Sequence, residues 1–76
     1  MARYFFNVHD GTNLQDHEGL ELPDLRAVRS EAIMAAGEIL RDVHGALGEE
    51  EWVMEVTRES GQLVLTLRFS ATQHVR

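Results

Sequence analysis

The sequence predicts an α+β fold of two layers, in which one long helix packs on one face of an antiparallel sheet of about four strands. Two observations carry this prediction. Apolar residues recur at steps of three and four over residues 24–45, as in an amphipathic helix. The segments on either side alternate between apolar and polar residues with a period of two, as half-buried strands do. The predicted element order is therefore ββαββ.

The first hairpin is predicted from residues 3–9 and 20–22. Residues 3–9 are rich in aromatic and β-branched side chains, which favour an extended backbone. A turn is expected at Asp10 and Gly11, and Pro23 ends the second strand. The polar residues 12–19 between them are expected to be the least structured part of the chain. The core face of this hairpin is predicted to carry Tyr4, Phe6, Val8, Leu20 and Leu22.

The predicted helix begins at Asp24, whose carboxylate can accept from the free amides of the first turn. It ends at His44 and Gly45, where glycine can adopt the left-handed conformation of a helix end. Gly37 lies inside the helix at a cost in helix propensity, so a close contact with the sheet is expected there. The apolar stripe consists of Leu25, Val28, Ala32, Ala35, Ala36, Ile39, Leu40 and Val43.

The second hairpin is predicted from residues 52–58 and 63–69. Opposed residues of an antiparallel pair share a face, so the loop between the strands must preserve parity. A two-residue loop at Ser60 and Gly61 does this by setting Val56 opposite Leu65. The inward residues are then Trp52, Met54, Val56, Leu63, Leu65, Leu67 and Phe69. Residues beyond 70 are expected to fray.

Length and composition limit the possible functions. Seventy-six residues make one domain, expected to be ordered over about residues 2–70, with a modest core. The absence of cysteine excludes disulfides and thiol chemistry and suits a reducing cytoplasm. A net charge of −6 disfavours nucleic-acid binding. No apolar run is long enough to span a membrane, and the N-terminus lacks the pattern of a signal peptide.

One helix covers one face of the predicted sheet, so the other face is expected to be exposed. Most of its residues are polar or small, and the exceptions are Phe5, Val53 and Val64. If these three cluster, they form an apolar patch suited to a protein interface, and a symmetric homodimer is its natural form. The alternative is three scattered apolar residues, which is normal on a protein surface.

The first loop offers imidazole and carboxylate groups that could bind a divalent metal. These are His9, Asp10, Asp16, His17 and Glu18. They match no known ligand spacing, and a polar loop of an acidic protein contains such residues by composition alone. We therefore predict neither a metal nor a cofactor and keep His9, Asp16, His17 and Glu18 as weak metal-site candidates.

Catalytic groupings are not evident in the sequence. The serines at positions 30, 60 and 70 have no reason to meet a histidine and an acid, and the six glycines do not form a phosphate-binding loop. We therefore expect no enzymatic activity.

Several short motifs in order resemble one family. They are Tyr4-Phe5-Phe6, Asp10-Gly11, Glu18-Gly19, Leu22-Pro23-Asp24, the alanine-rich helix and the last hairpin. Over residues 3–70 the chain resembles the short bacterial proteins catalogued as domain of unknown function 6894. The resemblance implies a bacterial stand-alone domain of this size with no assigned activity, and it implies no catalytic residues.

Two functional hypotheses remain. The first is a small cytoplasmic, non-enzymatic domain that binds a protein partner or itself, as a homodimer. The alternative is a metal- or small-molecule-responsive module that uses the first loop.

Overall fold

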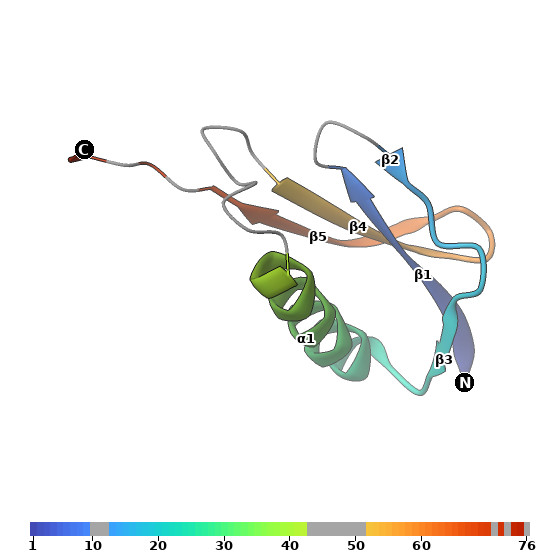
Figure 1. Ribbon diagram of the computed structural model, residues 1–76. Helices are drawn as coiled ribbons and strands as arrows, with labels where there is room; N and C mark the ends of the chain where they lie inside the picture. Colours follow the sequence, from blue (N-terminus) through green and yellow to red (C-terminus); the bar gives the residue numbers. More distant parts are fainter. Residues whose placement is uncertain (10–12, 43–51, 71, 73, 76) are drawn as a thin grey trace.

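The order of the structural elements is the predicted one, with one short strand added (Figure 1). The computed structural model describes residues 1–9, 13–42, 52–70, 72, 74 and 75. The predicted turn at Asp10 and Gly11 and the predicted helix end at His44 and Gly45 lie outside these residues. The elements are β1 (Ala2–His9), β2 (Asn13–Leu14), β3 (Leu20–Leu22), α1 (Leu25–Asp42), β4 (Trp52–Arg58) and β5 (Leu63–Phe69).

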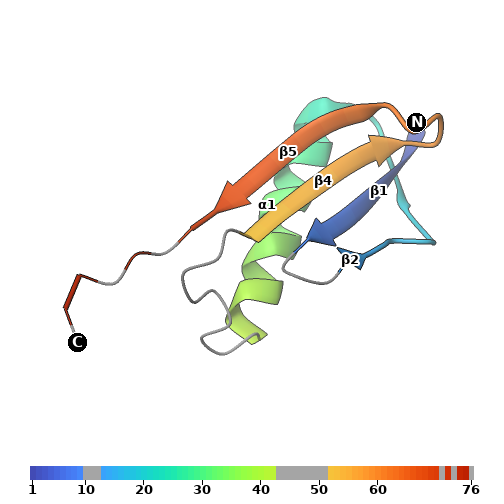
Figure 2. The same ribbon diagram turned by 90° about the horizontal axis from the view of Figure 1, so that it is seen from above.

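The strands form one antiparallel sheet with β1 in its interior (Figure 2). On one side β1 pairs with β4, and β4 pairs with β5. On its other side β1 pairs with β3 at its beginning and with β2 at its end. Because β2 lies in the polar stretch expected to be unstructured, the sequence pattern missed it.

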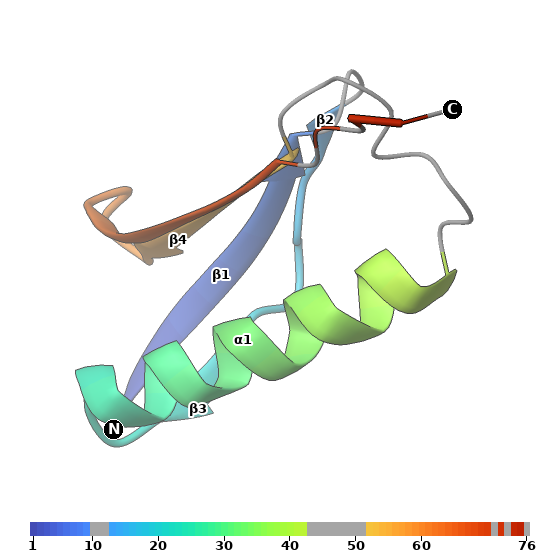
Figure 3. The same ribbon diagram turned by 90° about the vertical axis from the view of Figure 1, so that its left-hand side faces the viewer.

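Helix α1 forms the second layer and lies across one face of the sheet (Figure 3). Asp24 caps it as predicted, because the Ala27 N–H donates to Asp24 Oδ1 at 2.8 Å. The helix turns Val28, Ala32 and Ala36 onto the sheet, each with 0% exposure. Within the described residues, no helix combines the length and apolar character that crossing a bilayer requires.

Gly37 does not make the predicted close contact. A Cβ atom built at this position would meet nothing within 4 Å. The reason is its place on the helix, since Gly37 adjoins the buried Ala36 but is itself exposed. The prediction of close packing at Gly37 is therefore wrong.

The core lies between α1 and the two central strands. Its buried members are Tyr4, Val8, Val28, Ala32, Ala36, Trp52, Met54 and Val56. The five that lie on strands were all predicted to face inward. Trp52 also contacts Phe69 of the neighbouring strand edge to face, with ring centroids 5.3 Å apart.

The turn between β4 and β5 differs from the predicted two-residue loop. Arg58 donates its N–H to the Gln62 carbonyl, and Gly61 donates to the Arg58 carbonyl, both at 2.9 Å. The loop therefore has three residues, 59–61, with Gly61 at a φ of 92°. A register shift then follows, because Thr57 pairs with Leu63 but Val56 pairs with Leu65. This β-bulge restores the predicted pairing from Leu65 onward.

The bulge reverses the predicted faces of two residues. Leu63 lies opposite Thr57 and shares its face, away from the helix, so it is 50% exposed. Val64 packs against the core instead. The inward assignment of Leu63 and the outward assignment of Val64 are therefore both wrong. Leu20 and Leu25 are also more exposed than predicted, at 41% and 50%, because each lies at the start of its element.

Candidate functional site

The first loop is held against β1 by the carboxylate of Asp16. Its Oδ2 accepts the N–H of Phe6 at 3.1 Å, and its Oδ1 accepts the N–H groups of Glu18 and Gly19, also at 3.1 Å. Its own N–H donates to the side-chain oxygen of Asn7. Asp16 therefore takes the place of a strand between β2 and β3, where no ladder bond reaches Phe6.

These contacts set the charge state of Asp16. Partial burial alone would raise the pKa of its carboxyl group. The backbone N–H groups of Phe6, Gly19 and Glu18, helped by the neighbouring His17, outweigh burial, so the pKa lies below its ordinary value. At neutral pH the group is an ionised acceptor that is already occupied by protein donors.

The far end of the loop depends on Gly19, which has a φ of 72°. A Cβ atom there would lie 2.9 Å from Arg3 Cγ, from Phe5 Cε1 and from the Tyr4 carbonyl oxygen. Phe5 therefore packs its ring against Gly19 and is half-buried rather than free. Arg3 reaches across the same segment and donates to the Glu18 carbonyl at 2.7 Å.

The predicted metal candidates have other contacts. His9 Nε2 lies 2.8 Å from Glu55 Oε1 on β4, while Asp16 binds backbone amides. His17 and Glu18 are exposed. Across the residues that the structure describes, no three His, Asp or Glu side chains are grouped so that they could hold a metal ion. Asp10 lies outside those residues.

An open pocket of about 300 Å³ lies on the sheet face that the helix leaves uncovered. Its floor is formed by Phe5, Asn7 and Thr57, and its walls by the first loop and the turn after β4. The wall residues are Gln15, Asp16, His17, Arg58, Glu59 and Gly61. The sequence predicted the loop side of this pocket but not the turn side, because only the sheet register brings residues 15–17 and 58–61 together.

Of the two alternatives that the sequence left open for Phe5, Val53 and Val64, the structure shows three scattered residues rather than an apolar cluster. Phe5 pairs with Thr57 at one end of the ladder between β1 and β4, whereas Val53 pairs with His9 at the other. The His9 and Glu55 side chains, 2.8 Å apart, lie beside Val53, and Val64 packs against the core. The structure thus separates the three residues, while their role in binding stays a prediction.

Strand β5 forms the other surface of interest. The helix buries three residues of β4 but none of β5, whose inward Leu65, Leu67 and Phe69 stay only half-buried. The sole strand beside β5 in the described part of the chain is β4. Its outer edge is seven residues long and contains no proline or lysine, two residues that commonly protect edge strands.

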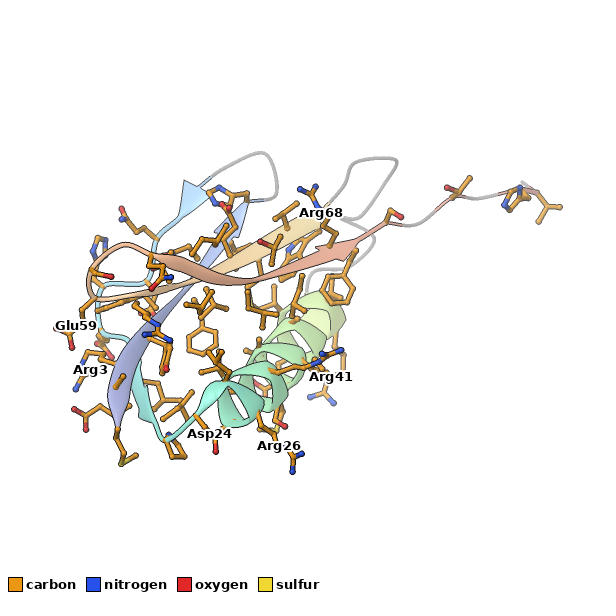
Figure 4. The ribbon with its side chains drawn as sticks, turned by 180° about the vertical axis from the view of Figure 1, so that it is seen from behind. Arg3, Asp24, Arg26, Arg41, Glu59 and Arg68 are labelled. Atoms are coloured by element: carbon orange, nitrogen blue, oxygen red, sulfur yellow. The ribbon has the colours of Figure 1, made fainter. Side chains whose placement is uncertain are left out.

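The opposite edge of the sheet is short and interrupted. There β2 and β3 contribute two and three residues, with the Asp16 loop between them. Figure 4 shows Arg68 on the side of β5 that faces away from α1, while Arg26 and Arg41 project from the helix. The sequence alone could not identify β5 as an edge, because strand order is set by pairing between distant segments.

The serines Ser30 and Ser60, which are candidate nucleophiles by residue type, lie in a structural contact or on the surface. Ser60 Oγ accepts the N–H of Gln62 at 3.3 Å within the turn, and Ser30 lies on the exposed side of α1. Neither position resembles an activated nucleophile, which needs an adjacent base.

Comparison with known proteins gives one result. No curated protein and no solved structure matches the chain significantly. One family model matches residues 3–70. This range contains the whole described helix and all the strands, apart from Ala2 at the start of β1. The chain therefore belongs to the family described as Domain of unknown function (DUF6894).

Proposed function

We propose that this chain is a small, non-enzymatic domain of the cytoplasm that acts by binding protein, with a second copy of itself as its first partner. The observation that carries the proposal is the incomplete cover of β5. Among the described residues, β5 is an apolar strand with no buried residue and no strand on its outer edge, and such a surface suits a partner that completes it.

The size of the core supports the same proposal. Eight described residues are buried, and the sequence has no cysteine with which to form a disulfide. Domains of this size often gain stability from association, because their surface is large relative to their volume. A reducing compartment suits a chain without cysteine, and fractionation of native cells would test the cytoplasmic assignment.

Size-exclusion chromatography with light scattering tests the self-association. We expect the mass of two chains at micromolar concentration, and twofold symmetry in the NMR spectrum of that species. A single-chain mass across the concentration range would remove the homodimer from the proposal.

A second candidate is a small-molecule-responsive module that uses the first loop. The pocket of about 300 Å³ between this loop and the turn after β4 favours it. Its lining mixes an aromatic ring, amides and charges of both signs, as small polar ligands require. Thermal melting with added metabolites and with zinc, nickel or manganese tests this candidate, since a ligand that binds the folded state raises Tm. An unchanged Tm throughout would end it.

A further inference from the structure

In the described part of the chain no strand pairs with the outer edge of β5, and the alternation of its backbone defines how a further strand could pair there. The backbone N–H of Arg58 donates to the Gln62 carbonyl, so the N–H and C=O groups of Arg58 point toward β5. Because these groups alternate along a strand, those of residues 56, 54 and 52 also point toward β5. Their partners Leu65, Leu67 and Phe69 therefore bond back to β4. Thr66, between them, points its N–H and C=O away from β4, toward the open side of the sheet.

We infer that β5 pairs antiparallel with β5 of a second copy, so that the two sheets join into one continuous sheet beneath two helices. This inference rests on the proposed homodimer and names the surface that forms it.

The side chains of β5 suit pairing with themselves. When two β5 strands pair antiparallel about a twofold axis, the residues whose N–H and C=O groups point away from β4 form the hydrogen-bonded pairs. Thr66 then lies opposite Thr66 of the second copy. Leu65 and Leu67 of one copy then lie opposite Leu67 and Leu65 of the other, because opposed residues share a face. The half-buried leucines of each copy thereby cover those of the other.

The one charged residue of β5, Arg68, does not oppose this arrangement. When Thr66 lies on the axis, each Arg68 is two residues from it, so the two arginines are four residue steps apart along the strands. This is about 13 Å, beyond the Debye length of about 8 Å at physiological ionic strength. No like charges are placed directly opposite one another.

The other sheet edge does not offer an equivalent partner. It consists of β2 and β3, which are two and three residues long and are separated by the loop that Asp16 holds. Of the two sheet edges in the described part of the chain, only the one formed by β5 offers a strand of seven residues. The contact is therefore between identical surfaces rather than head to tail.

Thr66→Pro tests the strand pairing. Proline removes the outward N–H of Thr66 but leaves the bonds of Leu65 and Leu67 to β4 intact. We expect the variant to keep its circular dichroism spectrum and to raise the dimer dissociation constant by about a hundredfold, from lost hydrogen bonds and steric exclusion. The matched control Thr66→Ala keeps the N–H and should remain dimeric. A folded Thr66→Pro variant that dimerises like the native chain overturns the inference while leaving the proposed homodimer in place.

A second measurement does not depend on the folding of the proline variant. Since the chain contains no cysteine, Thr66→Cys provides a single site for a spin label. In the dimer we expect strong dipolar broadening between the two labels at position 66. A label on the exposed Gln15→Cys, at the opposite edge of the sheet, should show none. A dimer in which position 66 shows no broadening contradicts strand pairing, whereas a wild-type monomer contradicts both this inference and the homodimer.

Discussion

At the scale of single residues, the side chain of Asp16 accepts backbone hydrogen bonds that a neighbouring strand would otherwise accept. It satisfies backbone donors of β1 and of its own loop, including the Phe6 N–H that no neighbouring strand reaches. Neither the hydrophobic periodicity nor the secondary-structure propensity of the sequence can predict such a contact, because it joins residues ten positions apart through a side chain. The sequence marked Asp16 as a weak metal ligand, whereas the structure gives its oxygens to backbone amides.

Removing this carboxylate should weaken the fold. We expect Asp16→Ala to lower the free energy of unfolding by about 1–2 kcal/mol, since several hydrogen bonds to a charged acceptor are lost but water still reaches the site. Asp16→Asn should cost less, because it keeps one acceptor oxygen. Urea titration measures both, and the exposed Glu59→Ala serves as a control that should change stability by less than about 0.5 kcal/mol.

The lowered pKa of Asp16 also predicts an acid dependence. Because the pKa is lower in the folded than in the unfolded chain, the ionised carboxylate stabilises the fold at neutral pH. This contribution is lost as the pH falls below about 4, through the folded-state pKa. The stability difference between the native chain and Asp16→Asn should therefore shrink as urea titrations move from pH 7 toward pH 3. A difference that stays constant would contradict the role assigned to the charge.

Two glycines provide a matched comparison of steric and backbone effects. Both Gly19 and Gly61 have positive φ, but only at Gly19 would a Cβ atom meet neighbours, at 2.9 Å. Gly61→Ala should cost about 1–2 kcal/mol from the left-handed backbone alone. Gly19→Ala should cost more, because the Tyr4 carbonyl cannot move without breaking the sheet. Equal Tm losses in the two variants would show that the contact at Gly19 is not restrictive.

At the scale of elements, the sequence predicted the helix, the two long strands of the second hairpin and most of their inward residues. Trp52, Met54 and Val56 alternate without interruption, so period two placed them correctly. It failed at Leu63 and Val64, because a three-residue loop with a bulge gives the same pairing beyond Leu65 as a two-residue loop. Local turn signals fit both, and only the register distinguishes them.

The helix offers a test of how closely it approaches the sheet. Ala32 has no exposed surface, so Ala32→Leu must displace the helix and should cost at least about 1–3 kcal/mol. On the open side of the same helix, Gly37→Ala should instead stabilise the protein by about 0.5–1 kcal/mol, since alanine is the better helix former and nothing obstructs its Cβ. Opposite shifts in Tm are expected, and a neutral Ala32→Leu would mean that the helix sits farther from the sheet.

At the scale of the whole molecule, net charge and association are linked. Each chain carries a formal charge of −6, so two chains repel one another over distances that salt screens. We expect the dimer dissociation constant to fall as sodium chloride rises from low to physiological concentration. Analytical ultracentrifugation measures this, and a constant that rises with salt would point to an interface held by opposite charges instead of apolar strands.

The unequal edges of the sheet determine how far assembly can proceed. One margin is broken into fragments of two and three residues, and the other is long enough to recruit a partner. Joining two molecules along the long margin consumes the site at which a third could attach. Growth into filaments, the usual hazard of an exposed apolar edge strand, would thus stop at the dimer. The contacts of Asp16, which hold the loop between β2 and β3, would help to keep the protein from polymerising.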